Sequence, residues 1–294
     1  MSGKNVSWSV LLVLIFSCSI AVPASAQHFQ QLKGTLASVS AGRNEVFGFD
    51  VHGTVWRLNA ARTGFAKISG VSLDQVAVGG GTVSQLDEVW GISAVGNIYR
   101  FNYSTKTFDQ IPGTLSQITV GTGNFDQCHP YEVWGISPNQ NVFRYDYCSG
   151  QFNQSPGSLL TQISTSAGDL WGLNSSGQIF HYNFSFEEFI QVPGILTQIA
   201  VGVNDVWGVD SATSVYRYDV STNTFDLEGG STDLVAAGGD GVWEIVGEDD
   251  VFRFDPSTEQ FVSASANLKS VSVGSGAGIF GVSSSNQVFA FVRP

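Results

Sequence analysis

The sequence predicts an all-β fold, a seven-bladed β-propeller whose blades are four-stranded antiparallel sheets. Two observations lead to this prediction. A unit of about forty residues recurs along the chain, and each copy holds only short alternating apolar segments separated by polar turns. The segment at 28–34 also has the pattern of the last strand of a unit, whereas the final unit is one strand short. The first strand is therefore expected to complete the last blade and close a ring.

Residues 1–26 are predicted to be a signal peptide. A short start containing Lys4 leads into the apolar run WSVLLVLIFSCSIAV, and a small-residue Ala-Ser-Ala cleavage site precedes Gln27. The run is shorter than the ~20 residues of a membrane span. Cleavage is therefore favoured over an uncleaved anchor and over lipid attachment at Cys18. We expect residues 27–294 to be a single β-propeller domain that is secreted, extracellular or, in a bacterium, periplasmic.

Seven units align on an aromatic residue, which glycine follows in six of them. These aromatic residues are Phe47, Trp90, Trp134, Trp171, Trp207, Trp243 and Phe280, at intervals of 43, 44, 37, 36, 36 and 37 residues. In unit 5, strands are predicted at 196–202, 205–209, 214–219 and 224–229. The short polar turns between them indicate antiparallel neighbours, and no stretch has the periodicity of a helix.

The last unit provides the evidence for closure. It runs LKSVSVG, GIFGV and QVFAFV over residues 268–292 and ends at Pro294. The segment HFQQLKG at 28–34 matches the fourth-strand segment TFDQIPG at 107–113. A linear stack of hairpins is the alternative fold, and the additional strand at the start argues against it.

Within each unit, the second and third strands are expected to form a hairpin with a two-residue turn. In unit 4 this turn is Ser175-Ser176, which places Trp171 opposite Phe180. The same register forms aromatic pairs in the other units, so all six tryptophans after residue 26 are expected in the core. The other pairs are Phe47 with Trp56, Trp90 with Tyr99, Trp134 with Phe143, Trp207 with Tyr216 and Trp243 with Phe252.

The cysteines predict one disulfide. Cys18 lies in the predicted leader, which leaves Cys128 and Cys148 as a pair in an exported chain, where thiols oxidise. The predicted hairpin register places Cys148 opposite His129, and a break at Pro130 would absorb the offset of one residue. A bridge between these cysteines is expected to stabilise the hairpin by about 3 kcal/mol.

Charge and motif content argue against several classes of function. The formal net charge is −12, and losing Lys4 with the leader leaves 12 basic against 25 acidic residues, or −13. This balance disfavours nucleic acid and anionic membranes as partners, and no membrane insertion is expected. Motifs of hydrolases, metalloproteases and nucleotide-binding loops are absent. We therefore expect no catalytic activity, no metal and no cofactor.

One polar position recurs after the aromatic residue of the third strand. It is arginine in five units, His181 in unit 4 and Ala290 in unit 7. These side chains are expected in the seams between blades, beside aromatic rings. Either a repeat carboxylate such as Asp205 or Asp169 neutralises them, or they line carbohydrate pockets, and the two interpretations are compatible. The candidate carbohydrate-binding residues are Arg57, Trp90, Arg100, Trp134, Arg144, Trp207, Arg217, Trp243 and Arg253.

The connections between the first and second strands are longer in units 2 and 3. They contain GGGTVSQLDE at 79–88 and GTGNFDQCHPYE at 121–132. Loops at the rim of a rigid scaffold often carry binding sites. These two are therefore candidates for a protein partner, and tolerated insertions are the alternative.

The unit LSQITVG, EVWGIS, NVFRYD and FNQSPG, over residues 115–157, resembles the tectonin repeat of the tachylectin and fish-egg lectin group. The resemblance extends over residues 28–294 and includes QIPG followed by LTQIAVG. It implies a β-propeller that recognises surface glycans without catalysis. An intra-repeat disulfide such as Cys128–Cys148 is similar to the fish-egg lectin pattern.

The chain departs from this family pattern in three ways. Many relatives have six units instead of seven, Glu244 replaces the glycine after Trp243, and units 1 and 7 have Phe47 and Phe280 in place of tryptophan. Together, these observations predict a secreted, multivalent carbohydrate-binding lectin with glycans or glycoconjugates as partners. The alternative is an extracellular protein-interaction platform that uses the long loops of units 2 and 3.

Overall fold

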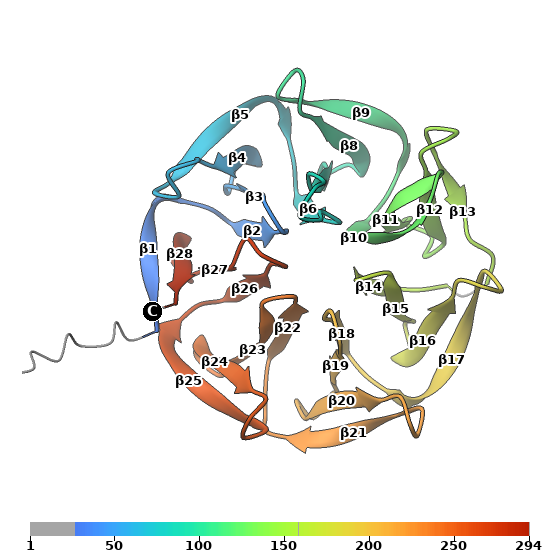
Figure 1. Ribbon diagram of the computed structural model, residues 1–294, viewed down its shortest axis with the longest axis vertical. Coiled ribbons are helices and arrows are strands. Elements are labelled where there is room, and N and C mark those ends of the chain that lie inside the picture. Colours follow the sequence, from blue (N-terminus) through green and yellow to red (C-terminus); the bar gives the residue numbers. More distant parts are fainter. Residues whose placement is uncertain (1–26, 158, 294) are drawn as a thin grey trace, which may run out of the picture.

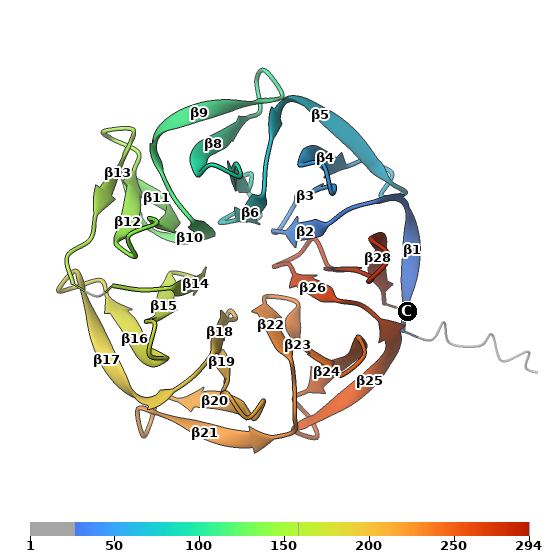
Figure 2. The ribbon, with the colours of Figure 1, turned by 180° about the vertical axis from the view of Figure 1, so that it is seen from behind.

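The computed structural model describes residues 27–293, except residue 158, and these residues form seven four-stranded antiparallel sheets. The sheets stand as blades around a central axis (Figures 1 and 2). The predicted seven-bladed propeller is therefore confirmed. The predicted signal peptide, residues 1–26, lies outside the described residues. No helix in the described part of the chain is long and apolar enough to cross a membrane.

In each of the first three blades the strands follow in chain order from the innermost strand, near the axis, to the outermost strand. Blade 1 contains β2 (Ser38–Ala41), β3 (Val46–Phe49), β4 (Thr54–Leu58) and β5 (Phe65–Ser72). Blade 2 contains β6 (Gln75–Gly79), β7 (Glu88–Ile92), β8 (Asn97–Asn102) and β9 (Thr107–Thr114). Blade 3 contains β10 (Gln117–Asp126), β11 (His129–Ile136), β12 (Val142–Asp146) and β13 (Gln151–Gln154).

The next three blades have the same strand order. Blade 4 contains β14 (Gln162–Ser166), β15 (Asp169–Leu173), β16 (Gln178–Asn183) and β17 (Glu188–Ile195). Blade 5 contains β18 (Gln198–Val201), β19 (Val206–Val209), β20 (Val215–Asp219) and β21 (Thr224–Gly229). Blade 6 contains β22 (Leu234–Gly238), β23 (Gly241–Val246), β24 (Asp250–Asp255) and β25 (Gln260–Asn267).

Blade 7 is built from both ends of the described chain. It contains β26 (Ser270–Val273), β27 (Ile279–Val282), β28 (Gln287–Val292) and, at its rim, β1 (His28–Thr35). In the antiparallel pair of β1 and β28, Phe29 lies opposite Phe291 and Gln30 opposite Ala290. Figure 1 shows the blue first strand beside the red last strand. The predicted closure is confirmed.

The hairpin of the second and third strands differs from the predicted register by one residue. Trp90 lies opposite Arg100, and Gly91 lies opposite Tyr99. The other blades have the same register, as in blade 4, where Trp171 lies opposite His181. The predicted aromatic pairs are therefore wrong: each core aromatic residue faces the recurring polar position, and each aromatic residue of the third strand faces the glycine position. These incorrect pairs are Phe47 with Trp56, Trp90 with Tyr99, Trp134 with Phe143, Trp171 with Phe180, Trp207 with Tyr216 and Trp243 with Phe252.

The physical reason is the length of the connecting loop. In blade 4 the amide N–H of Asn174 donates to the carbonyl of Gln178, so the loop between them has three residues instead of two. Gly177, the last of the three, has a φ of 75°. A three-residue hairpin loop takes a left-handed residue at this position, which glycine adopts without strain.

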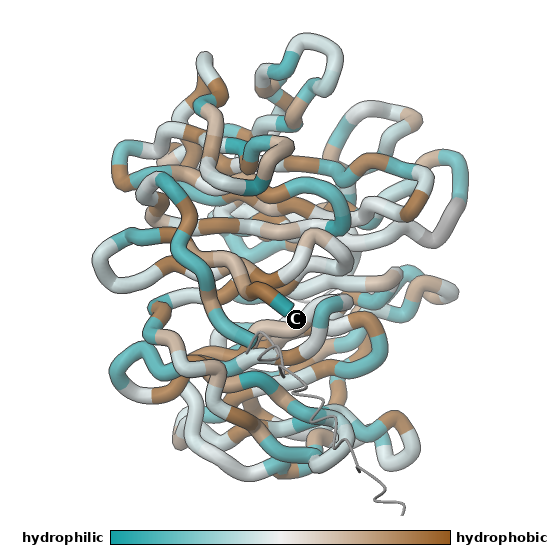
Figure 3. Tube along the Cα trace, turned by 60° about the vertical axis from the view of Figure 1, so that its left-hand side comes forward, coloured by the Kyte–Doolittle hydropathy of each residue, from teal (hydrophilic) through white to brown (hydrophobic). Residues whose placement is uncertain are grey.

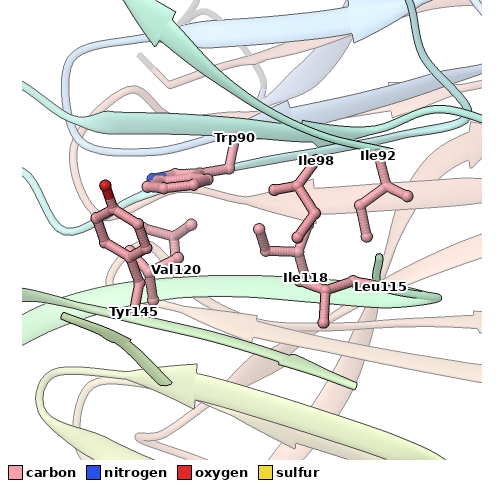
Figure 4. Close-up of a cluster of buried hydrophobic side chains, with 8 residues drawn as sticks. Trp90, Ile92, Ile98, Leu115, Ile118, Val120 and Tyr145 are labelled. Atoms are coloured by element: carbon pink, nitrogen blue, oxygen red, sulfur yellow. The ribbon is translucent and has the colours of Figure 1, made fainter. Parts of the chain in front are cut away.

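The hydrophobic core lies between the blades. Trp90, Ile92 and Ile98 of blade 2 pack against side chains of blade 3, including Leu115 and Tyr145 (Figure 4). Equivalent clusters follow around the ring, and Figure 3 shows short hydrophobic stretches spread along the whole tube. The tryptophans of the aromatic-glycine positions are at most 1% exposed, namely Trp90, Trp134, Trp171, Trp207 and Trp243.

Trp56 is the exception to the predicted tryptophan core. Phe47 takes the buried position of blade 1 and is 0% exposed. Trp56 is only half-buried, and its indole N–H donates to Asp50 Oδ2 at 3.0 Å. The expectation that Trp56 joins the core is therefore wrong, because the corrected register turns its side chain to the opposite face of the blade.

A recurring glutamine joins the innermost strands of neighbouring blades. Gln117 Nε2 donates to the carbonyl of Ile163 at 3.0 Å, and its Oε1 accepts the amide N–H of Ile163 at 2.9 Å. The amides of Gln75 and Gln198 make the same two bonds to the next blade. The glutamine of the LTQIAVG motif thus has a structural role: it satisfies backbone groups that have no partner within their own blade.

The predicted disulfide is confirmed. Cys128 and Cys148 are bonded, with their Cα atoms 4.9 Å apart. The amide N–H of Tyr147 donates to the carbonyl of Cys128 at 2.9 Å, which brings the start of β11 beside the end of β12. The bridge closes a loop of 20 residues in blade 3.

Candidate functional site

Each interface between neighbouring blades is called a seam here, with seam 2 between blades 2 and 3 and seam 7 between blades 7 and 1. In seam 2, Arg100 Nε and Nη2 donate to the two carboxylate oxygens of Glu88, both at 2.7 Å. The indole N–H of Trp90 donates to Glu88 Oε2 at 3.0 Å. The three side chains share one face of the sheet because Glu88 precedes Trp90 by two residues and Arg100 lies opposite Trp90.

The same arrangement recurs in seams 1 and 3. Arg144 Nε donates to Glu132 Oε2 at 2.9 Å, and the Trp134 indole N–H donates to the same oxygen at 2.7 Å. Arg57 Nε donates to Glu45 Oε2 at 2.7 Å beside Phe47. The acid is thus a fixed part of the seam in blades 1 to 3.

In seams 4 and 5 an aspartate takes the place of the glutamate, and in seam 4 a histidine also takes the place of the arginine. His181 Nε2 lies 2.6 Å from Asp169 Oδ1, and the Trp171 indole N–H donates to Asp169 Oδ2 at 2.8 Å. In seam 5, Arg217 Nη2 lies 3.8 Å from Asp205 Oδ2, which is an ion pair with looser geometry. A repeat carboxylate therefore faces the recurring arginine in seams 1, 2, 3 and 5 and the histidine in seam 4.

The seam environment shifts the pKa of the groups it pairs. Burial lowers the pKa of Arg100, but the hydrogen bonds and charge of Glu88 outweigh this effect and raise the pKa above its ordinary value. Burial raises the pKa of Asp169, but hydrogen bonds from His181 and Trp171 outweigh it and hold the pKa below the usual range. Both groups are therefore charged at neutral pH.

Aromatic rings from two blades flank the guanidinium groups of Arg57, Arg100, Arg144 and Arg217. Arg100 Cζ lies 5.7 Å from the Trp90 ring centroid and 5.0 Å from that of Tyr147 in blade 3. Arg144 lies 5.3 Å from Trp134 and 5.5 Å from Phe184 in blade 4. Arg217 lies 5.5 Å from Trp207. The arginines thus hold neighbouring blades together through cation–π contacts.

The structure places the predicted arginines and tryptophans in the same seams but exposes them unequally. The side chains of Arg57, Arg100 and Arg217 are 30%, 34% and 37% exposed, whereas that of Arg144 is 14% exposed. Trp90, Trp134, Trp207 and Trp243 are each 0% exposed. In this conformation, a ligand at the mouth of a seam can reach the guanidinium groups but not the indole faces. Carbohydrate binding by these residues stays a prediction.

Two seams have pockets at their outer edge. A pocket of about 310 Å³ in blade 2 contains the Glu88–Arg100 pair of seam 2 and is also lined by Asn102, Tyr103 and Asp109. Asn102 Nδ2 donates to Asp109 Oδ2 at 2.8 Å. Asp109 could not be placed beside Arg100 from the repeat pattern, because this proximity depends on the pairing of β8 with β9.

A larger pocket of about 560 Å³ lies where blade 1 meets blade 2. It is lined by Glu45, Arg57, Asn59 and Arg62 of blade 1 and by Lys106 of blade 2. Sequence reasoning identified only Arg57 in this group. Asn59, Arg62 and Lys106 come from strand connections whose positions follow from the ring.

The last two seams depart from the pattern. In seam 6 the position two residues before Trp243 is Gly241, and Arg253 forms no ion pair within the described residues. In seam 7 glycine and Ala290 occupy the acid and arginine positions. Arg62 of blade 1 reaches into seam 7 instead, where its Cζ lies 5.4 Å from the Phe280 ring centroid and its Nη2 donates to the carbonyl of Ala277.

The long connections of units 2 and 3 meet at one end of the ring, where the innermost strands lead into the second strands, and form a surface called the rim surface here. The carboxylate of Asp87 is buried and accepts four backbone N–H groups, from Arg43, Asn44, Glu45 and Gly81, at 2.6–3.0 Å. The Tyr131 hydroxyl donates to the carbonyl of Leu86 at 3.1 Å. Val83 and Leu86 are 88% and 53% exposed. Most of residues 121–132 continue strands β10 and β11 rather than forming a loop.

Comparisons with known proteins agree with this architecture. The family model of the Tectonin domain matches residues 35–225 and 195–293. A comparison with curated proteins gives no match. YCF48 from Cyanidioschyzon merolae is similar in structure, with a TM-score of 0.67, 13% identity, and coverage of 90% of this chain and 98% of that chain.

Two further solved structures share the fold. YCF48 bound to D1 peptide has a TM-score of 0.68 at 12% identity, with 91% of this chain and 97% of that chain covered. Yeast RCC1 (Prp20), bound to Kap60, has a TM-score of 0.65 at 11% identity, with 88% and 80% covered. At such low identity the likeness shows the fold alone.

Proposed function

Because the chain belongs to the tectonin-domain family, and because polar, aromatic-flanked seams recur around its ring, we propose that it is a secreted, non-catalytic lectin that binds several glycans at once. The observation that carries this proposal is the repeated arrangement of arginine, carboxylate and aromatic rings in seams 1 to 3. A binding scaffold accounts for this repetition, since a catalytic site needs one special constellation and not several equal ones.

The chemistry of the seam mouth suits sugar hydroxyl groups. Arginine contributes N–H donors and the acid contributes acceptor oxygens, so adjacent hydroxyls of one ring find both kinds of partner. At seam 2, Asn102 and Asp109 add an amide and a second carboxylate beside Arg100. Because Trp90 and Trp134 are buried and their indole N–H groups donate to Glu88 and Glu132, we assign recognition in these seams to the polar edge and assign these two indoles to the support of the arginines.

Repetition would make weak sites effective. A rigid ring that presents several mM-range sites to a glycan-coated surface gains an avidity of about 10²–10⁴ over one site. The disulfide between Cys128 and Cys148 supports an exported protein, because such bridges persist in oxidising compartments.

A glycan array tests the proposal, and titration calorimetry with the best monovalent glycan then counts the sites. We expect more than one site per chain. The paired variant Glu88→Gln/Arg100→Met removes the ion pair without leaving a buried charge and is expected to lose part of the binding. The control Lys67→Ala removes an exposed charge on the outer strand β5 and should bind normally. No response to any glycan, methylated and amino sugars included, would reject the lectin assignment, and turnover of a glycoside would replace it with an enzyme.

A protein-interaction platform is the second candidate, favoured by the exposed Val83 and Leu86 on the joined rim surface. Solved structures that share the fold include propellers in complex with a peptide and with a protein partner. Val83→Ser/Leu86→Ser should abolish such an interaction and leave sugar binding intact. If this variant loses glycan binding instead, the rim and not the seams is the sugar site.

A further inference from the structure

Seam 6 keeps the donors of the recurring arrangement but has lost its carboxylate. Trp243 lies opposite Arg253, as Trp90 lies opposite Arg100 in seam 2. The residue two positions before Trp243 is Gly241, where the equivalent residues of seams 2 and 3 are Glu88 and Glu132. Seam 6 therefore differs by one side chain from seams 2 and 3, in which the chain itself supplies the carboxylate.

The indole N–H of Trp243 has no acceptor. Trp243 is 0% exposed, and its Nε1 lacks a hydrogen-bond partner within the described part of the chain. In seams 2 and 3 the equivalent N–H donates to the glutamate oxygen that also accepts from arginine. Leaving a buried donor unsatisfied costs about 1–3 kcal/mol, so a ligand that supplies an acceptor here would recover this free energy.

Seam 5 shows that an indole N–H without an acceptor does not by itself make a site for an external anion. The Trp207 N–H also lacks a partner among the described residues, but Asp205 remains beside Arg217 and balances its charge. Asp255, two residues further along β24, interacts electrostatically with Arg253, but its carboxylate accepts the amide N–H and the hydroxyl of Ser257. Seam 6 thus combines the unpartnered N–H with an arginine that forms no ion pair in the described chain. This combination is the signature of a site for an external anion.

The backbone at Gly241 leaves room for such a group. A Cβ atom placed on Gly241 would have only Trp243 Nε1 within 4 Å, at 3.9 Å. The position of a first side-chain atom on Gly241 is therefore unoccupied and lies beside the indole N–H. Glu244 does not replace the missing acid. It is adjacent to Trp243 on β23, and adjacent side chains of a strand point to opposite faces of the sheet.

A second cation stands at the rim of seam 6. Arg293 occupies the repeat position of Tyr147, the residue that contacts Arg100 across seam 2. Its side chain is 55% exposed; its Nη2 forms an ion pair with Asp240 Oδ1 at 3.4 Å and donates to the Asp240 carbonyl at 3.1 Å, so its charge is already balanced. The Asp240 carboxylate is engaged by the backbone N–H groups of Gly276 and Gly278, both at 3.0 Å.

We infer that seam 6 binds the carboxylate of an acidic sugar such as a uronic acid. The ligand carboxylate takes the place that Glu88 and Glu132 hold in seams 2 and 3, accepting hydrogen bonds from Trp243 Nε1 and from the Arg253 guanidinium. Arginine recognises carboxylates with two parallel N–H donors, which adds selectivity for this group over a neutral hydroxyl. The choice of a sugar as the carrier of the carboxylate rests on the proposed lectin function.

Nuclear magnetic resonance of the indole N–H groups tests the inference. Sodium glucuronate is titrated into the folded, ¹⁵N-labelled protein, and Trp243→Phe identifies the Trp243 resonance by its loss. Phenylalanine is tolerated at this repeat position, as Phe47 and Phe280 show. We expect glucuronate to shift the Trp243 resonance and to leave that of Trp207 unchanged. Glucose and acetate at equal concentration should shift it much less.

Variants separate the contributions of the two donors. Arg253→Ala copies the natural Ala290 of blade 7 and is expected to abolish the response, and Trp243→Phe should weaken binding about tenfold, measured by calorimetry. Lys67→Ala should bind normally. An unchanged affinity in Arg253→Ala, or a Trp243 resonance that ignores glucuronate, would overturn the inference, and an equal response to acetate would overturn the assignment to a sugar.

The same titration separates this inference from the lectin proposal. If no neutral glycan binds but glucuronate still shifts Trp243, the proposed binding of neutral sugars at the other seams fails and the carboxylate site of seam 6 stands. If neutral glycans bind and glucuronate leaves Trp243 unchanged, only the present inference fails.

Discussion

Glu132 is fully buried in seam 3, and Arg144 is the cation that balances its charge. The pair is therefore a structural part of the interface between blades 3 and 4, where Arg144 also contacts Phe184. Removing one member of a buried ion pair leaves the other charge without compensation, which costs about 3–5 kcal/mol.

Arg144→Ala is accordingly expected to lower the free energy of unfolding by about 3–5 kcal/mol. Urea unfolding measures this change, and the double variant Glu132→Gln/Arg144→Met should recover a large part of it. A loss of the same size in the double variant would show that packing, and not the unpaired charge, dominates the effect.

Glu244 is a second buried acidic residue, and its ionised form is unfavourable in the folded chain. In the other blades the equivalent glycine lies against a leucine, and a Cβ on Gly135 or Gly208 would lie 2.3 Å from a leucine methyl carbon. Blade 6 has Thr232 in place of that leucine, which makes room for Glu244. Burial without a compensating cation raises the pKa of Glu244 to about 7.

The sign of the resulting pH dependence follows from this raised pKa. The folded state holds the Glu244 proton more tightly than the unfolded state, so this stabilising contribution is complete below about pH 4.5 and is lost as pH rises toward 7. Thermal unfolding between pH 4.5 and 8 should show this loss in the wild type but not in Glu244→Gln. A wild-type profile that Glu244→Gln leaves unchanged would contradict the assignment.

At the scale of elements, the strands were predictable and their register was not. Alternating apolar residues and short polar turns identified the strands of each unit. The register failed because Ser175-Ser176 resembles a complete two-residue turn, whereas Gly177 belongs to the loop. The third loop position is glycine in units 1, 2 and 4 but Gln140, Thr213, Asp249 and Asn286 elsewhere, all with positive φ. A glycine that marks the third loop position is therefore present in only three of the seven units.

The disulfide hairpin gives a prediction at this scale. Cys128→Ser/Cys148→Ser should lower the free energy of unfolding by about 3 kcal/mol, because the unfolded chain regains the freedom of a loop of about 20 residues. Guanidinium unfolding of the double variant measures this effect, and reducing agent should destabilise the wild type alone. If the variant is as stable as the wild type, the bridge constrains neither blade 3 nor the unfolded chain.

At the scale of the whole molecule, the closed ring was predictable from the match between the two ends of the repeat pattern. The site was only partly predictable. The sequence placed Arg100 and Trp90 in one seam, but only the structure shows that the indole is covered and that Asp109 joins the pocket. Arg62 could not be found from the repeat, because it enters seam 7 from a connection in the neighbouring blade.

Closure predicts what the removal of β1 will do. Phe29 packs edge-on against Trp243 with ring centroids 5.6 Å apart, and Leu32 is buried in the core between blades 7 and 1. A chain that begins at residue 36 should lose these contacts and leave β28 as an open edge, so we expect aggregation or loss of a cooperative thermal transition. Adding a peptide of residues 27–35 should restore the transition, and a truncated chain that melts like the wild type would contradict the role of β1.

The central claim is that the seams between blades are the binding surface. A crystal structure with the tightest-binding glycan tests it most directly. We predict ligand density at the mouths of at least two seams, in contact with guanidinium groups such as those of Arg57 and Arg100. Ligand bound only on the rim surface around Val83 and Leu86, or only in the axial channel lined by β6, β10 and β14, would contradict the claim.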